Sequence, residues 1–115
     1  MNILIILNDA PYANEKSYNG IRTGLQLLNQ IKDIEVNIYL FSDAVGCATK
    51  NQNPSTTKYN AGELISELIK KGAKIKLCKS CLDTRGNGVI IDGVEISNMT
   101  EYADWILKSN KIITF

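Results

Sequence analysis

The sequence predicts an α/β fold with three layers, in which helices cover both faces of a mostly parallel sheet. Short apolar runs alternate with segments of helical periodicity along nearly the whole chain. The first run, residues 2–7, is apolar at almost every position, as is typical of a strand buried on both faces. The chain has 115 residues, enough for one domain spanning 1–115 to bury a core of its own.

The first expected elements are a strand, a helix and a second strand. Residues 2–7 and 36–41 are rich in β-branched or aromatic side chains, and each run stops at a polar pair. A helix is expected over about residues 15–31, because apolar side chains recur there at helical spacing: Tyr18, Ile21, Leu25 and Leu28. Such a unit joins two parallel strands by a right-handed crossover.

The unit then repeats with different lengths. Apolar side chains between residues 61 and 69 mark a second helix, and Gly72 is expected to end it. The strand over 73–78 that follows alternates lysines with apolar residues. This alternation disfavours a fully covered strand, so we expect it at an edge of the sheet or facing another subunit.

The last third contains short extended pieces and one more helix. Residues 89–97 offer one or two such pieces around a turn at Asp92-Gly93. Asn98 and Glu101 resemble a capping box. A closing strand is expected over 111–115, after a helical stripe that comprises Met99, Tyr102, Ala103, Ile106 and Leu107. Trp105 falls outside this stripe, so we expect it to be exposed, either as an interface anchor or as an ordinary surface residue.

Composition excludes several classes of protein. Thirteen basic and twelve acidic side chains leave a net charge of +1, which gives no global field for nucleic acid or an anionic membrane. The apolar run Ile3–Leu7 lacks the flanks of a signal peptide, and nothing approaches the ~20 apolar residues of a membrane helix. We therefore expect a cytoplasmic protein that does not bind nucleic acid directly.

The cysteine count points to free or functional thiols. Three cysteines, an odd number, argue against a secreted disulfide scaffold. The absence of histidine removes the commonest zinc ligand and the commonest general base. We expect neither a metal nor a cofactor.

Candidate site residues follow the predicted strands, where open α/β sheets have their ligand crevice. Asp9 and Asp43 could bind a cation there, although at strand ends they more simply cap helices or turns. Cys47, beside Val45 and Ala48, has no charged neighbour and is expected to be a buried small hydrophobe.

Cys78 ends the third predicted strand among cations. Lys76, Lys79 and Arg85 are near in sequence and favour a thiolate, and a helical turn after Cys78 would add to that effect. The sulfur is then a nucleophile, or else Cys78 is a half-buried structural residue beside solvated lysines. With Cys81 three residues on, a zinc clip would need a second such pair or added histidines, and the chain has neither. A redox pair, and an attacking thiol with a neighbour that resolves or protects it, remain as readings.

The segment "TRGNG", residues 84–88, could cradle an anion with its N–H groups and Arg85. It matches no nucleotide-binding pattern. Its two glycines also suit a tight turn.

Five motifs in order along the chain resemble the DsrE/DsrF-like family, specifically its YchN-like branch. They are "NDAPY", "FSDAV", "KLCKSCLDTRG", "IDGVEI" and the closing W-x-L-x-x-x-K-I-I-T-F. The resemblance implies a parallel five-stranded sheet between two helical layers, and homo-oligomers that are often hexamers. Sulfur-relay members carry a persulfide on a cysteine at the end of the third strand, which matches Cys78, and the Arg-Gly that follows matches Arg85-Gly86. Cys81 is typical of the branch.

The leading hypothesis is therefore a sulfur-relay protein, a sulfurtransferase in the sense of a persulfide carrier. Cys78 would accept sulfane sulfur from a donor persulfide and pass it to another protein's thiol, with Lys76, Lys79 and Arg85 stabilising the anionic sulfur. Two alternatives stay open: a non-catalytic oligomeric binding or regulatory subunit with Cys78 buried at an interface, and a redox switch between Cys78 and Cys81.

Overall fold

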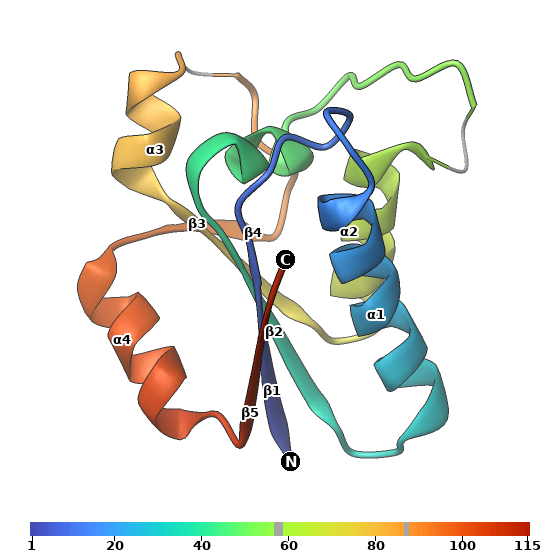
Figure 1. Cartoon of the computed structure of the whole chain (residues 1–115), viewed down its shortest axis with the longest axis vertical. Coiled ribbons are helices and arrows are strands. Elements are labelled where there is room, and N and C mark those ends of the chain that lie inside the picture. The colour runs from blue at the N-terminus through green and yellow to red at the C-terminus, as the bar shows by residue number, and fades with distance from the viewer. Residues whose placement is uncertain (57–58, 87) are drawn as a thin grey trace.

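The computed structural model describes residues 1–56, 59–86 and 88–115. Strands and helices alternate along the chain, and the sheet stands between two layers of helices (Figure 1). The elements are β1 (Asn2–Leu7), α1 (Lys16–Gln30), β2 (Glu35–Leu40), the 3-10 helix η1 (Ser42–Ala48), α2 (Ala61–Lys70), β3 (Lys74–Cys78), α3 (Lys79–Thr84), β4 (Val94–Ser97), α4 (Met99–Lys108) and β5 (Lys111–Thr114). The predicted fold class is confirmed.

The five strands form one parallel sheet in the order β4-β3-β2-β1-β5. β3 lies between β2 and β4, so the expectation that the third strand is an edge was wrong. Its alternating pattern arises because one face of β3 carries Lys76, which α4 covers and pairs with Glu101 at 3.5 Å between Nζ and Oε1. The short strands β4 and β5 form the two edges.

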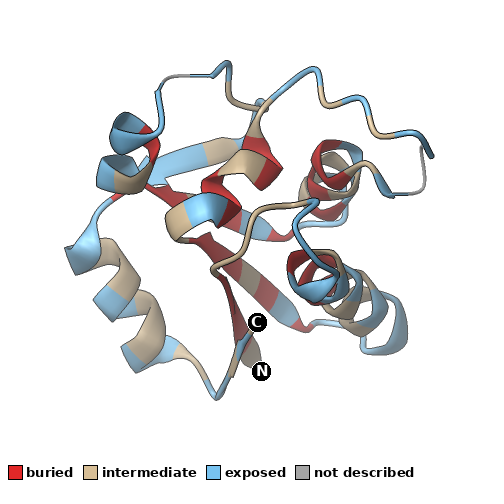
Figure 2. Cartoon of the chain, turned by 45° about the horizontal axis from the view of Figure 1, so that its top comes forward, coloured by how far each residue is buried: buried red, intermediate tan, exposed pale blue. Residues whose placement is uncertain are grey.

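The main core lies between the sheet and the helices α1 and α2. Ile3, Ile5 and Leu7 belong to this core together with buried residues of both helices, such as Ile21 and Leu68. Figure 2 shows buried stretches on the strands and on both helices. Leu4 and Ile6 point to the opposite face, under α4. A strand covered on both faces explains the nearly unbroken apolar run of β1.

The face under α4 holds an aromatic cluster around Tyr39. Its ring lies 4.6 Å from Phe41, 4.9 Å from Tyr102 and 6.1 Å from Trp105, measured between centroids. Trp105 therefore faces the sheet, contrary to expectation, and the Lys76 Nζ lies 4.8 Å from its ring centroid.

The predicted apolar stripe of α4 was correspondingly divided between two faces. Tyr102 and Ile106 pack on the sheet, whereas Ala103 is exposed and Met99 and Leu107 are 64% and 83% exposed. The rotation of the helix is set by Trp105, the largest side chain it can bury.

Turns and caps follow the sequence closely. The Asn98 side chain accepts a hydrogen bond from the Glu101 N–H at 3.0 Å, which is half of a capping box. The Glu101 carboxylate turns instead to Ser97 and Lys76. Gly72 and Gly93 have φ of +97° and +95°, a conformation that favours glycine, so both turns form where expected.

Residue 87, within the "TRGNG" segment, lies outside the described residues. Before it, Arg85, which was expected to contribute to an anion site, is the C-cap of α3, and Gly86 has a φ of +83°. Within the described part of the chain, none of the helices combines the length and the apolar composition needed to cross a membrane.

Candidate functional site

Cys78 joins a strand directly to a helix. It is the last residue of β3 and the N-cap of α3, so no loop separates the two elements. Its Sγ accepts a hydrogen bond from the backbone N–H of Cys81, with 3.4 Å between nitrogen and sulfur. The Ser80 hydroxyl oxygen lies 3.2 Å from the same sulfur. A cysteine sulfur thus takes the place that Ser, Thr, Asp or Asn usually fills at a helix start.

These contacts favour the thiolate. Burial raises the pKa of the Cys78 thiol, but hydrogen bonds from Cys81 and Ser80 together outweigh it, so its pKa lies below the ordinary cysteine value. A lowered pKa increases the fraction of nucleophilic thiolate at neutral pH.

Cys78 lines a pocket of about 270 Å³ and is 9% exposed. The wall combines aromatic rings, hydroxyls and one pair of opposite charges: Tyr39, Phe41, Lys79, Ser80, Asp83, Ser97, Asn98 and Met99. Larger hollows of about 350 and 310 Å³ lie around Gln52 and around Tyr12, and neither is lined by a cysteine among the described residues. The chemistry therefore favours the smaller pocket.

Cys81 is half-buried beside Cys78, and both thiols are free. Burial raises the pKa of Cys81, and its side-chain hydrogen bond with Cys78 raises it further, while the Ser42 backbone and the charge of Arg85 act in the opposite direction. Cys81 is thus the protonated member of the pair when Cys78 is ionised.

Each cation expected near Cys78 has an acidic partner. Lys79 Nζ lies 2.7 Å from Asp83 and Arg85 Nε lies 2.6 Å from Asp43, and Lys76 pairs with Glu101 as described above. The Arg85 guanidinium also donates to the Cys81 carbonyl at 3.1 Å. Of the three cations, Arg85 comes nearest to the expected role of stabilising a thiolate, because its charge lowers the pKa of the Cys81 thiol. Hydrogen bonds account for the lowered pKa of Cys78, and none of these lysines is among its causes.

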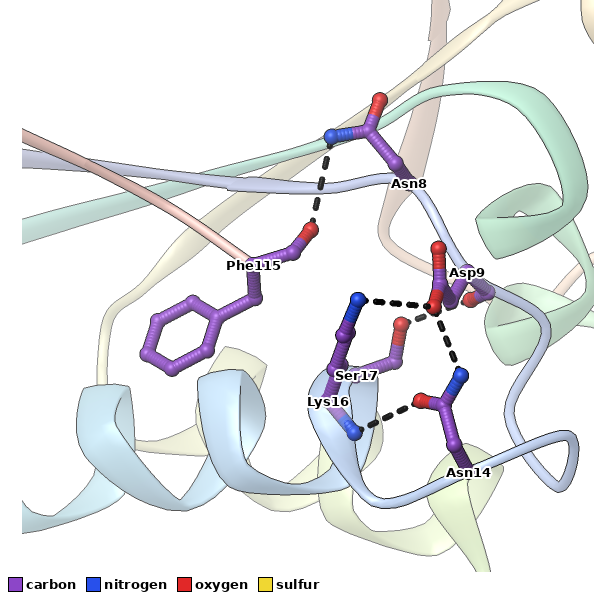
Figure 3. A network of polar contacts seen from close by, with 6 residues as sticks. All are labelled: Asn8, Asp9, Asn14, Lys16, Ser17 and Phe115. Atoms are coloured by element: carbon purple, nitrogen blue, oxygen red, sulfur yellow. Dashed lines mark hydrogen bonds and ion pairs between the residues drawn. The ribbon is translucent and has the colours of Figure 1, made fainter.

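Asp9 belongs to a separate network at the start of α1 (Figure 3). Its carboxylate accepts a hydrogen bond from the Asn14 amide at 2.7 Å and lies 4.0 Å from Lys16 Nζ, while its carbonyl accepts from the Ser17 hydroxyl at 2.6 Å. Asp9 therefore organises the entry to α1. Asp43 holds Arg85, so the structure does not bring the two aspartates together.

Cys47 is fully buried in the main core, where burial raises the pKa of its thiol to about 12. It is chemically separate from the other two cysteines. Across the described ranges, no cluster of three His, Cys, Asp or Glu side chains could hold a metal ion.

Sequence reasoning missed the residues that complete the pocket, chiefly Ser80, Tyr39 and Phe41. A signal for Ser80 existed, since a hydroxyl two residues after a helix N-cap lies in the first turn, on the side of the cap. Tyr39 and Phe41 are brought in by the register of β2 with β3, which places Tyr39 beside Lys76.

Comparisons with known proteins agree with this architecture over the full chain. Protein YchN of Escherichia coli K12 is 36% identical over 115 residues, covering 98% of this chain and 97% of YchN. Its crystal structure superposes with a TM-score of 0.94 over 100% of this chain and 99% of that one. The uncharacterised protein MK0008 of Methanopyrus kandleri is 34% identical, covering 98% of this chain and 93% of its own.

A more distant structure shares the fold alone. The protein of unknown function MTH1491 of Methanobacterium thermoautotrophicum is 15% identical and superposes with a TM-score of 0.76, over 99% of this chain and 97% of its own. The model of the DsrE/DsrF-like family matches residues 1–115. The chain therefore belongs to the DsrE/DsrF-like family, which is generally associated with sulfur relay, and within it resembles YchN.

Proposed function

We propose that this chain is a sulfur-relay protein of the cytoplasm that carries sulfane sulfur as a persulfide on Cys78. The observation that carries the proposal is the Cys78 sulfur itself, which accepts a hydrogen bond from the Cys81 N–H, lies in hydrogen-bond contact with the Ser80 hydroxyl and lines a pocket. Membership of a family associated with sulfur relay supports it. The reaction would be a sulfurtransferase half-reaction followed by delivery to a partner protein.

Two displacements at sulfur make up the cycle. The Cys78 thiolate attacks the outer sulfur of a donor R–S–SH, the S–S bond of the donor breaks, and R–SH leaves with the proton. Cys78 is then a persulfide anion. A thiolate of the acceptor protein attacks the outer sulfur of that persulfide, and Cys78 leaves as a thiolate. Both steps use thiols alone.

The surrounding residues have distinct roles in this scheme. Ser80 and the Cys81 N–H stabilise the leaving and attacking forms of the Cys78 sulfur. Arg85, held by Asp43 and followed by the turn at Gly86, places a positive charge near the Cys81 side of the pair. Lys79 stands at the pocket wall, whereas Lys76 supports α4 beneath it.

Loading the protein with inorganic polysulfide tests the proposal. Trypsin cleaves after Lys76, Lys79 and Arg85, so Cys78 and Cys81 fall on separate peptides, 77–79 and 80–85. After alkylation, the peptide 77–79 should carry one added sulfur atom in the wild type and in Cys47→Ser. A peptide 77–79 without added sulfur, or equal total gain in Cys78→Ser, would end the proposal.

A redox switch is the second candidate, favoured by the contact between the two free cysteines on one turn of helix. Oxidation would join Cys78 and Cys81 in a disulfide and release two electrons to an oxidant of the thiol–disulfide class. A measured reduction potential far below the poise of the cytosol would remove it as a switch.

We also propose that the chain forms a homo-oligomer, a hexamer by analogy with its family. Met99, which also lines the Cys78 pocket, and Leu107 are large apolar side chains of α4 exposed to water, as is common at interfaces. Native mass spectrometry gives the stoichiometry. If Cys78 resists alkylation until the oligomer is dissociated, the chain is instead a non-catalytic binding or regulatory subunit with that thiol sealed at an interface.

A further inference from the structure

The Cys78 pocket combines a nucleophilic sulfur with two opposite charges. Lys79 and Asp83 both line it, and they occupy successive turns of α3 with 2.7 Å between Nζ and Oδ2. Tyr39 and Phe41 provide an aromatic wall, and the Tyr39 hydroxyl donates a hydrogen bond to the Asn98 carbonyl at 3.2 Å. A ligand in this pocket meets a thiol, apolar rings and both signs of charge.

The burial of Cys78 limits what can reach it. At 9% exposure the residue is recessed, and the pocket volume of about 270 Å³ is close to the lower end for small-molecule sites. A protein thiol reaches this sulfur only when its own backbone is drawn close to the recess, which is the geometry that delivery to an acceptor protein requires. A free molecule of amino-acid size fits the recess directly.

The ion pair in the wall is easily exchanged. The Lys79 and Asp83 side chains are 68% and 49% exposed, and ion pairs in such positions contribute little to stability. A ligand that brings its own carboxylate and ammonium can replace each partner with an equivalent one. The exchange preserves the number of charge pairs and desolvates no unpaired charge.

We propose that this pocket binds a zwitterionic persulfide of amino-acid size, with the ligand carboxylate on Lys79 and the ligand ammonium on Asp83. The simplest such molecule is cysteine persulfide. This inference rests on the proposed function and names its donor class. The Cys78 thiolate attacks the outer sulfur, the S–S bond of the donor breaks, and free cysteine leaves carrying the proton, so no oxidant or reductant is consumed.

The test alters the charges of the donor and of the protein in turn. Initial rates of sulfur loading on Cys78 are measured by intact mass, with fragment spectra locating the added sulfur, for cysteine persulfide and for its N-acetyl and methyl-ester derivatives. The wild type should lose about tenfold in rate with each derivative, the value of one charge-assisted hydrogen bond. Asp83→Asn should remove the N-acetyl penalty, and Lys79→Gln should remove the ester penalty. Glu67→Gln and Lys70→Gln, exposed charges of α2, serve as matched controls and should keep both penalties.

The outcomes separate this inference from the function on which it rests. Loading of the wild type at equal rates by all three donors would overturn the zwitterion site but not the proposed sulfur relay. The same conclusion would follow if the rate losses with the N-acetyl and ester donors persisted unchanged in Asp83→Asn and Lys79→Gln. Failure of every donor, inorganic polysulfide included, to load Cys78 would overturn both. Because the comparison of derivatives uses the wild type, a variant that folds poorly does not affect it.

Discussion

Removing the Ser80 hydroxyl isolates one contact to the Cys78 sulfur. The two heavy atoms lie 3.2 Å apart, and Ser80 must be the donor when the sulfur is a thiolate, since a thiolate has no proton to give. Ser80 is exposed, so Ser80→Ala opens no cavity and strands no buried polar group. The backbone N–H of Cys81 keeps its contact.

The expected effect follows from the strength of that hydrogen bond. Hydrogen bonds to charged groups contribute about 1.5–3 kcal/mol, and competition from water at an exposed hydroxyl reduces this to about 1 kcal/mol. Loss of a contact made only to the thiolate raises the pKa of Cys78. The thiolate fraction should fall about fivefold at pH values below the pKa, and should not change well above it.

Alkylation of Cys78 as a function of pH measures this directly. The rate is followed on peptide 77–79, which separates Cys78 from Cys81. Ser80→Ala should react about fivefold more slowly than the wild type at low pH and equally fast at high pH, while Ser80→Thr, which keeps the hydroxyl, should follow the wild type. Superimposable profiles for Ser80→Ala and the wild type would refute the reasoning. A loss of equal size at every pH would also refute it, because it would indicate changed access.

Three further predictions concern the frame around the site. Cys47, whose pKa burial raises to about 12, should resist iodoacetamide in the native protein and react in denaturant; labelling as fast as Cys78 would contradict its placement. Gly20→Ala should lower the free energy of unfolding by about 1–3 kcal/mol, seen as a lower urea midpoint, despite the helix propensity of alanine. The reason is that the new methyl would collide with the fully buried Leu7 side chain; a raised midpoint would contradict this packing. Asn98→Ala should lower the free energy of unfolding by about 1 kcal/mol in the same assay, because α4 loses its N-cap; an unchanged midpoint would show that the cap is dispensable.

Most of the fold is predictable from local pattern. The helix expected over 15–31 is observed as Lys16–Gln30, and the first two strands agree within a residue at each end. Periodicity succeeds in these elements because α1 and α2 each bury one stripe against a sheet that is itself apolar.

The errors share one physical cause, a sheet face covered by a single helix. The lysines of β3 predict an exposed strand, yet Lys76 is covered, and its charge is met by Glu101 and by the ring of Trp105. Because both partners come from α4, no pattern within β3 could reveal them. The same pairing turned Trp105 inward and left Leu107 outside.

The strand-end position of Cys78 was predicted, but the groups that contact its sulfur were not. The strand end at Cys78 followed from topology, whereas the cations nearest in sequence extend to their own acidic partners. The groups that do reach the sulfur, the Ser80 hydroxyl and the Cys81 N–H, depend on α3 starting at Cys78 itself. A helix this short leaves almost no periodic signal in the sequence.

That direct junction of β3 to α3 has a kinetic consequence. A thiol on a flexible arm can collect cargo in one place and deliver it in another, but Cys78 cannot leave its position without unwinding a strand end and a helix start together. Donor and acceptor must therefore visit the same spot in turn, and each should competitively exclude the other. Turnover by such a carrier would follow ping-pong kinetics, with parallel lines in double-reciprocal plots.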